Sequence, residues 1–217
     1  MQTGAILFDM DGTVLDTLDD LTAAVNAALQ RFGRAGLSRE QVRAYVGNGS
    51  RVLIERAFPD ADAACVREIL AWYKPYYNAH CCERTQPYPG ILPLLTALRG
   101  AGLRLAVVSN KPDRTVRELS RRFFGGLIDL ALGENEEGGV RRKPWPDMLV
   151  HAAARLDVGL ADCLYVGDSE VDLATAAAAG VPCLSVTWGF RSREQLLAAR
   201  AERLFDSPEE LAAYLLK

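Results

Sequence analysis

The feature that most constrains the fold is a set of short apolar runs that are nearly continuous rather than alternating. Four of them stand out along the chain: AILF (5–8), RLAVVS (104–109), CLYVG (163–167) and PCLSV (182–186). Continuous runs of this length are typical of strands that are buried on both faces of a parallel sheet. A fifth run, LIDLAL (127–132), is less continuous but is also predicted as a strand.

Helical patterns lie between these strands. The segment 114–123 places apolar residues, the last being Phe123, on one side of a helix. An alanine-rich segment stops at Gly180, and DSPEEL (206–211) predicts a helix start with a capping box completed by Glu210. Strands that alternate with helices predict a doubly wound α/β domain with a mainly parallel sheet.

One interval breaks this alternation. The first strand ends near residue 9 and the next begins near residue 104, whereas a βαβ unit takes about 30 residues. The residues in between have helical patterns, including a capping box at SREQ (38–41). We therefore predict an all-helical cap domain at residues 17–86, inserted after the first strand of an α/β domain made of residues 1–16 and 87–217.

Composition and charge argue against several classes of protein. The 217 residues carry a formal net charge of −3, whereas a general nucleic-acid binder needs clustered positive charge. No apolar run approaches the roughly 20 residues of a membrane span, and the N-terminus lacks the basic start of a signal peptide. The five cysteines are odd in number and scattered, unlike a disulfide framework, and the adjacent pair Cys81 and Cys82 lacks the spacing of a zinc site. We expect a cytoplasmic protein without nucleic-acid or membrane partners.

Two acids, Asp9 and Asp11, follow the first apolar run directly. Residues two apart in an extended segment face the same way, so both carboxylates are predicted to point to one place. Gly12 then allows a sharp turn. Two neighbouring carboxylates repel each other, and a bound cation removes that conflict. A capped turn at a strand end is the alternative interpretation, since Asp and Gly are common turn residues.

Polar residues also follow two other predicted strands. Ser109 and Asn110 end one strand, and Asp168 ends another, with Asp172 four residues later. Lys143 precedes the helix that leads to the strand before Asp168. Each of these has a plain interpretation as a turn residue, a helix cap or a solvated basic edge. Together, however, they place polar groups at the carboxyl edge of one sheet, where open α/β sheets bind ligands.

Such a site suits phosphoryl transfer. Clustered carboxylates offer the oxygen ligands that Mg²⁺ prefers. A carboxylate can attack a phosphate ester to give an aspartyl-phosphate, provided that a metal and a lysine offset the repulsion. A second carboxyl group then protonates the leaving alcohol and later activates water. The helical insert would act as a lid that excludes water.

At this point the motifs resemble those of a known family. DMDGTV (9–14), SN (109–110), the lysine of RKP (142–144) and GDSEVD (167–172) are similar, in order and spacing, to the four motifs of the haloacid dehalogenase superfamily. The resemblance covers essentially the whole chain. It implies a Rossmann-like core, a cap between the first and second motifs, and Mg²⁺ as cofactor.

The resemblance also implies a role for each matching residue. Asp9 is the nucleophile and a Mg²⁺ ligand, and Asp11 is the general acid and base whose main-chain carbonyl touches the metal. Asp168 is a further metal ligand, and Asp172 supports the metal site. Four residues bind the transferring phosphoryl group or orient the loop around it, and Lys143 among them also screens Asp9: Ser109, Asn110, Lys143 and Thr13.

Within the superfamily the chain is most similar to the phosphoglycolate phosphatases, through segments such as PYPG (87–90) and VRAYVGNG (42–49). This implies hydrolysis of a small phosphorylated metabolite, 2-phosphoglycolate, to glycolate and phosphate. In the cap, Asn48 and Gly49 are expected to contact the non-phosphate end of the substrate, and Arg51 to meet its carboxylate. VGNG can also be a plain turn between helices.

Other functions remain open at this stage. A β-phosphoglucomutase-like mutase, a sugar phosphatase or a pyrophosphatase of the same superfamily differs only in the cap. A dehalogenase would leave Asp11 without a role. A phospho-accepting receiver domain shares acids at strand ends, but it is about half as long and has no helical insert. The sequence leaves the choice between monomer and homodimer open, and Asp16 has no assigned role.

Overall fold

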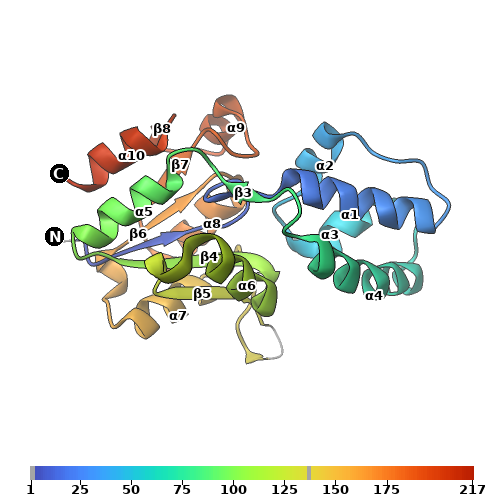
Figure 1. The fold of residues 1–217 in the computed structure, drawn as a ribbon, viewed down its shortest axis with the longest axis horizontal. Helices are drawn as coiled ribbons and strands as arrows, with labels where there is room; N and C mark the ends of the chain where they lie inside the picture. The colour runs from blue at the N-terminus through green and yellow to red at the C-terminus, as the bar shows by residue number, and fades with distance from the viewer. Residues whose placement is uncertain (1–2, 136–137) are drawn as a thin grey trace. The chain divides into compact units, whose positions relative to one another are not determined.

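The computed structural model describes residues 3–135 and 138–217. The chain separates into two compact units, Met1–Leu15 with Pro87–Lys217 and Asp16–Gln86. Figure 1 shows the first, which we call the core unit, as a sheet with helices on both faces, and the second, the helical unit, as a group of helices. The first strand and the return of the chain near residue 87 bound the insertion.

The core unit is built on a six-stranded sheet in the order β5-β4-β1-β6-β7-β8, in which every strand pair is parallel. Its strands are β1 (Ala5–Phe8), β4 (Arg104–Pro112), β5 (Leu130–Glu134), β6 (Cys163–Gly167), β7 (Cys183–Val186) and β8 (Leu204–Phe205). Its helices are α5 (Ile91–Gly100), α6 (Asp113–Phe124), α7 (Asp147–Leu156), α8 (Glu170–Ala179), α9 (Arg193–Ala198) and α10 (Pro208–Leu215), with 3₁₀ turns η1 (Gly125–Leu127) and η3 (Leu160–Asp162). The predicted doubly wound α/β fold is confirmed.

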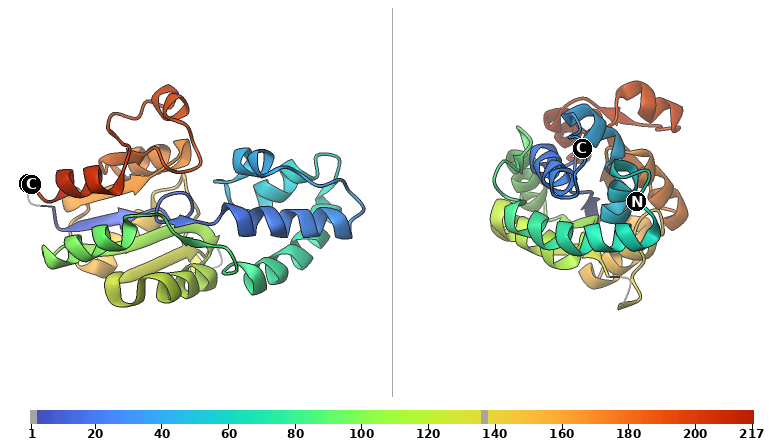
Figure 2. Two further views of the ribbon diagram at one scale, coloured as in Figure 1. Left: turned by 45° about the horizontal axis from the view of Figure 1, so that its top comes forward. Right: turned by 90° about the vertical axis from the view of Figure 1, so that its right-hand side faces the viewer.

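Strand β1 lies in the middle of this sheet and explains the continuous apolar run. All four of its residues are fully buried. Ala5 and Leu7 face α7 and α8 in one hydrophobic cluster, and the alternating residues Ile6 and Phe8 face the other side of the sheet. Because crossovers between parallel strands are right-handed, the direction in which the chain moves along the sheet decides which face the connecting helix covers. The connections with α5 and α6 move from β1 toward β5, and those with α7 and α8 move toward β7. Helices α5 and α6 therefore cover the face of the sheet opposite to α7 and α8. Figure 2 shows the strands between these helices.

Four details differ from the sequence prediction. The fifth strand begins at Leu130 rather than at 127, because residues 125–127 form η1. Phe124, not Phe123, is buried at the end of α6. Glu210 accepts a hydrogen bond from Asp206 N at 2.8 Å instead of closing the predicted capping box on Ser207. The short strand β8 at the sheet edge was not predicted, since two residues give too little pattern.

The helical unit contains α1 (Leu18–Arg31), α2 (Arg39–Tyr45), α3 (Gly49–Ala57) and α4 (Ala63–His80). The apolar faces of these helices pack on one another, with Val25, Ile54 and Ile69 fully buried. The capping box predicted at SREQ (38–41) is confirmed, because Ser38 and Gln41 bond each other's main-chain N–H groups. The short strands β2 (Leu15–Asp16) and β3 (Gln86–Pro87) pair where the chain leaves and re-enters the core unit.

Two acids hold the ends of the helical unit. Asp16, unassigned from the sequence, accepts a hydrogen bond from Leu18 N at 3.2 Å and so satisfies a donor in the first turn of α1. Asp20 is 2% exposed, and its carboxylate accepts from Arg84 N at 3.0 Å and Thr85 N at 2.9 Å. The start of α1 is therefore fastened to the segment by which the chain returns.

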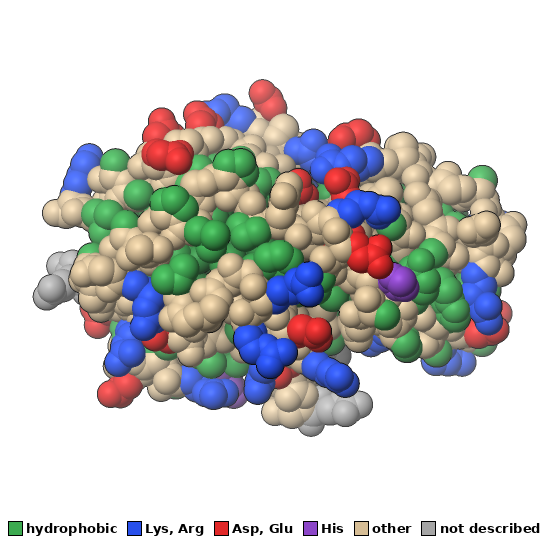
Figure 3. Space-filling model, viewed as in Figure 1, with side chains coloured by type: hydrophobic (Ala, Val, Ile, Leu, Met, Phe, Trp, Pro, Cys, Tyr) green, Lys and Arg blue, Asp and Glu red, His purple; other side chains and the backbone are tan. Residues whose placement is uncertain are grey.

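Charged side chains of both signs are interspersed over the face drawn in Figure 3, in keeping with the near-balanced composition. Among the described residues, no helix has the length and apolar character needed to cross a membrane.

Replacing Asp20 with alanine is expected to destabilise the helical unit by about 1.5–3 kcal/mol, because two main-chain donors lose a charged acceptor. The matched control is Asp19→Ala, whose exposed ion pair with Arg39 contributes under about 1 kcal/mol. Urea denaturation and hydrogen exchange of the Arg84 amide measure the difference. Equal losses in the two variants would contradict this interpretation of Asp20.

Candidate active site

The register of the central strands brings three polar residues to one edge of the sheet. Phe8 pairs with Val107 on one side and with Val166 on the other. Asp9 N continues the ladder by donating to Val166 O at 2.8 Å. Asp9 and Asp168 therefore follow neighbouring strands at their carboxyl ends, and Ser109 lies near the carboxyl end of β4, so the three meet at the edge that the sequence predicted.

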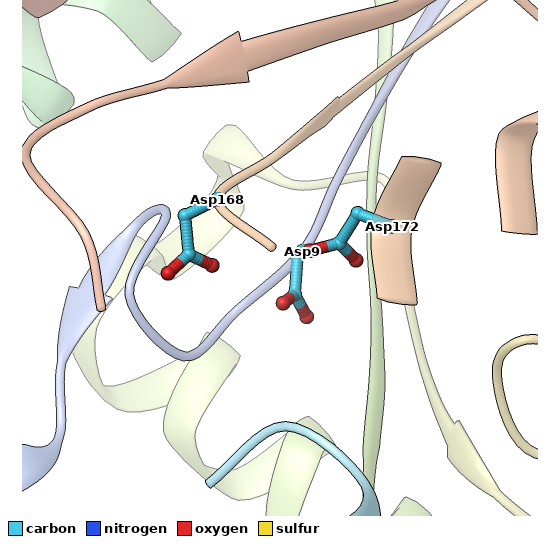
Figure 4. Close-up of side chains that lie close together, drawn as sticks. All are labelled: Asp9, Asp168 and Asp172. Carbon is cyan, nitrogen blue, oxygen red and sulfur yellow. The ribbon is translucent and has the colours of Figure 1, made fainter. Parts of the chain in front are cut away.

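Three carboxylates gather at this edge. Asp9, Asp168 and Asp172 are all buried, and each offers an oxygen within 4.8 Å of the others. Figure 4 shows Asp168 and Asp9 on loops that follow strands and Asp172 on a neighbouring helix, which is α8. Asp168 lies in the loop before α8, and Asp172 lies on α8.

Lys143 joins two of these carboxylates. Its Nζ lies 2.7 Å from Asp9 Oδ1, 2.7 Å from Asp172 Oδ1 and 3.2 Å from the Tyr165 hydroxyl. The side chain is only 3% exposed. An ammonium group has three N–H donors, and here each faces an acceptor of the protein. Tyr165 in turn donates to Asp172 Oδ1 at 2.7 Å, and Ser169 Oγ donates to Asp172 Oδ2 at 2.6 Å.

Burial and mutual repulsion perturb the acids of the cluster. Loss of hydration raises the pKa of Asp9 well above its usual value, and the charge of Asp172 adds to this increase. Loss of hydration, together with the charge of Asp172, also raises the pKa of Asp168, to about 7. Burial acts in the same direction on Asp172, but Lys143 together with the hydrogen bonds from Ser169 and Tyr165 outweighs it and lowers the pKa of that carboxyl. For Lys143 burial is likewise outweighed, and the two carboxylates raise its pKa.

The two acids of the first motif, which were predicted to point to one place, bond different partners. Asp9 binds Lys143, whereas Asp11 Oδ1 lies 3.0 Å from Lys111 Nζ and Asp11 Oδ2 accepts from Ser109 Oγ at 3.3 Å. The extended segment ends at Phe8, and the chain then turns, so the two-residue alternation does not apply. Asp11 still lies close enough to contribute to the raised pKa of Asp9.

Two predicted phosphate-binding residues hold other parts of the site. The Asn110 amide brackets the main chain of Lys143: its Oδ1 accepts from Lys143 N at 2.7 Å, and its Nδ2 donates to Lys143 O at 3.2 Å. Thr13 Oγ1 donates to Asp168 Oδ1 at 3.2 Å. Contact of these side chains with a phosphoryl group stays a prediction.

The loop after β7 contributes residues that sequence reasoning missed. Phe190 N donates to Asp168 Oδ2 at 2.7 Å, and the Trp188 indole donates to Thr13 O at 2.9 Å. A Cβ on Gly189 would clash with Gly12 O and Asp168, so only glycine permits this approach. Nothing in the sequence indicates the partner of Trp188, which lies 175 residues away. Lys111, directly after the SN motif, was also missed.

The cap residues predicted to contact substrate all belong to the helical unit. Asn48 precedes the first residue of α3, Gly49, in the turn after α2. Arg51 forms an exposed ion pair with Glu55 on the same helix, at 3.6 Å. Their contact with a substrate stays a prediction.

The donor set fits a hard divalent cation. Asp9 and Asp168 are buried carboxylates with raised pKa values, and a cation between them would remove the repulsion that raises those values. All of the candidate ligand atoms are oxygens, the type that Mg²⁺ prefers. A Cβ at position 12 would clash with the Asp168 carboxylate. Because Gly12 has no side chain, it leaves room beside this candidate metal ligand.

Comparison with known proteins agrees with this geometry. A family model described as haloacid dehalogenase-like hydrolase matches residues 3–180. The chain belongs to the haloacid dehalogenase-like hydrolases. A phosphoglycolate phosphatase of Xylella fastidiosa is 35% identical over 208 residues, which cover 95% of this chain and 90% of that protein. This member of the family is an enzyme of the phosphatase type.

Solved structures show the same fold. A crystal structure of a protein provisionally named phosphoglycolate phosphatase, from Lactobacillus delbrueckii subsp. bulgaricus, has a TM-score of 0.94 and 37% sequence identity over 99% of both chains. The structure of CbbY from Rhodobacter sphaeroides in complex with phosphate has a TM-score of 0.80 at 28% identity, covering 97% of this chain and 96% of that one. A mutant of CbbY has been solved with xylulose-(1,5)bisphosphate.

Binding of Mg²⁺ is expected to raise the melting temperature more at about pH 8 than at about pH 5.5. The raised pKa of Asp168, about 7, means that the folded metal-free protein binds more protons than the unfolded chain between about pH 4 and 7. Its stability therefore falls as the pH rises through that window, and Mg²⁺ replaces the proton. Saturation to about 100 times Kd adds about 2.7 kcal/mol, or about 5–10 °C.

The control for this measurement is Asp168→Asn, which should lose most of the shift and its pH dependence. Differential scanning calorimetry with and without Mg²⁺ at the two pH values gives the comparison. An equal Mg²⁺ shift at both pH values, or an unchanged shift in the variant, would show that the cation does not bind at Asp168.

Proposed function

We propose that this enzyme hydrolyses a small phosphomonoester with Mg²⁺ as cofactor, through an aspartyl-phosphate on Asp9. The observation that carries the proposal is the separation of the two acids of the first motif. Asp9 lies at the end of a buried strand beside Lys143, and Asp11 is held apart by Ser109 and Lys111. This separation supports a mechanism in which one carboxylate attacks and the other moves protons.

The reaction takes place in two steps. In the first, an Asp9 oxygen forms a bond to phosphorus, the ester bond breaks, and Asp11 gives its proton to the leaving alcohol oxygen. In the second, Asp11 takes a proton from water, the water oxygen attacks phosphorus, and Asp9 is released as a carboxylate. Lys143, 2.7 Å from Asp9, offsets the repulsion between this carboxylate and the phosphate dianion.

The metal would be held by carboxylate oxygens of Asp9 and Asp168 and by the main-chain carbonyl of Asp11. When bound, Mg²⁺ supplies positive charge next to the phosphoryl oxygens. Asp172 supports the metal site without being a metal ligand itself, because its oxygens already bond Lys143, Tyr165 and Ser169. It fixes the ammonium that faces Asp9.

The residues proposed to serve the phosphoryl group divide into contacts and supports. Ser109 and Lys143 provide donors at the carboxyl edge of the sheet. Asn110 acts by holding the main chain of Lys143, and Thr13 acts by holding Asp168. A group that acts through another must still be placed accurately, because a small displacement at the reacting centre costs rate.

We propose 2-phosphoglycolate as the substrate, because similar proteins over nearly the whole chain are named phosphoglycolate phosphatases. In this proposal the helical unit is a cap that excludes water during the reaction. Its residues Asn48, Gly49 and Arg51 are the proposed contacts for the non-phosphate end. The cytoplasmic location and the choice between monomer and homodimer stay predictions.

One alternative has an observation in its favour. The similar protein CbbY has been solved with a sugar bisphosphate, so a sugar phosphatase of the same family is a second candidate. The mutase and pyrophosphatase alternatives share the core site but have no further support. The receiver-domain alternative is dropped, since the family match covers residues 3–180.

Asp11→Asn is expected to lower kcat by about 10²–10⁴-fold, because the amide cannot donate a proton to the leaving oxygen or take one from water. The control is Asp16→Asn in the same segment, where an amide oxygen can still accept from Leu18 N. Steady-state kinetics of phosphate release measure both variants, and circular dichroism confirms the fold. Full activity of Asp11→Asn would overturn the proposed mechanism.

A substrate panel decides the substrate. The panel contains 2-phosphoglycolate, hexose phosphates, xylulose-1,5-bisphosphate, nucleotides and pyrophosphate, and kcat/KM is measured for each with saturating Mg²⁺. We expect 2-phosphoglycolate to give the highest value. No preference for it would retire this substrate, whereas a preference for the sugar bisphosphate would favour the second candidate.

A further inference from the structure

Two lysines are buried in the core unit, and each is paired with a different acid of the first motif. Lys143 faces Asp9, and Lys111, 8% exposed, faces Asp11 at 3.0 Å. The three acceptors around Lys143 all belong to the protein: Asp9, Asp172 and Tyr165. Lys143 therefore lies beside Asp9, and Lys111 is the buried ammonium that lies beside Asp11.

We propose that Lys111 determines substrate specificity by pairing with an anionic group on the leaving alcohol, such as a carboxylate one carbon from the ester oxygen. This inference rests on the proposed function, since it takes Asp11 as the general acid. It names a residue of the core unit, not of the helical unit, as the one that distinguishes an acidic substrate from a neutral one.

The position of Asp11 supplies the geometric argument. A general acid must lie within hydrogen-bond reach, about 2.6–3.2 Å, of the oxygen that it protonates. Lys111 Nζ lies 3.0 Å from Asp11 Oδ1. The ammonium is thus within about 6 Å of the leaving oxygen when Asp11 acts on it through Oδ1. A carboxylate separated from that oxygen by one methylene group can reach the ammonium, whereas the phosphoryl group lies on the other side of the oxygen, toward Asp9.

The setting of Lys111 makes this ammonium selective. It stands on β4, the strand beside β1, and its main-chain N–H donates to Ser109 Oγ at 3.2 Å. A group on a strand is placed more accurately than one on a loop. Because the side chain is buried, its charge is screened less by water, so an added anion is attracted more strongly and a neutral group gains nothing.

Other cations have less suitable surroundings. Arg191 is buried, but its guanidinium bonds both oxygens of Glu170, at 2.8 and 3.1 Å. Arg51, the sequence-based candidate for the substrate carboxylate, is about half exposed and pairs with Glu55. The plainer interpretation of Lys111 is that it only orients Asp11 by compensating its charge, and this has a different kinetic signature.

The test compares three substrates that share one phosphoryl group: 2-phosphoglycolate, its neutral amide 2-phosphoglycolamide, and ethyl phosphate. Each is measured with saturating Mg²⁺ on the wild-type chain, Lys111→Met and Lys111→Arg. We expect wild type to prefer the acid over the amide. In Lys111→Met, KM for the acid should rise about 10–100-fold while KM for the two neutral substrates changes less than about twofold. Lys111→Arg, which keeps the charge, should retain part of the preference.

Several outcomes would overturn the inference. An equal fall in kcat for all three substrates in Lys111→Met, with KM for the acid unchanged, would show that Lys111 only orients Asp11. Loss of the acid preference in Arg51→Met, with Lys111→Met unchanged, would assign the role to Arg51. If Lys111→Met does not fold by circular dichroism, Lys111→Gln replaces it. A wild-type chain that hydrolyses all three substrates without preferring the acid would also overturn it.

Failure of the proposed function gives a separate result. A wild-type chain without activity on any of the three phosphomonoesters or on the sugar phosphates of the substrate panel would reject the phosphomonoesterase itself, whereas every outcome above requires measurable turnover. The activities of the wild-type chain on the acid and on the amide therefore distinguish failure of the proposed function from failure of the inference about Lys111, before any variant is made.

Discussion

The buried ammonium of Lys143 is the interaction on which the rest of the site depends. Three carboxylates with oxygens within 4.8 Å of one another would not remain together in a buried place without a compensating charge. Lys143 bonds two of them directly, at 2.7 Å each. Much of the surrounding structure serves to hold this lysine: Asn110 fixes its main chain, and Tyr165 completes its donors.

The packed sheet keeps these charged groups in fixed positions. Because β1 is fully buried between β4 and β6, the ends of the three strands cannot move independently. The loop after β7 adds a second constraint, since Phe190 and Trp188 bond Asp168 and the main chain of Thr13. Hydrophobic packing therefore sets the positions, and the hydrogen bonds at the edge set the directions of the carboxylates.

The sequence was sufficient to predict where the site residues lie in the sheet, but not in which direction their side chains point. Continuous apolar runs identify buried parallel strands, so the meeting of Asp9, Ser109 and Asp168 at one edge could be predicted. The partner of Asp11 could not, because the chain turns after Phe8 and the strand alternation ends there. Contacts such as the one from Trp188 to Thr13 join residues 175 positions apart, and a single sequence contains no periodic signal for them.

The stretch Ser109-Asn110-Lys111 shows how one strand end can serve both acids of the first motif. Contacts show that Ser109 and Lys111 face one way and Asn110 the other, in a part of β4 whose pairing with β5 is irregular, between Val108 and Pro112. The first two bond Asp11, and the third holds Lys143, which bonds Asp9. Asp9 and Asp11 therefore take their separate partners from successive residues near the end of one strand.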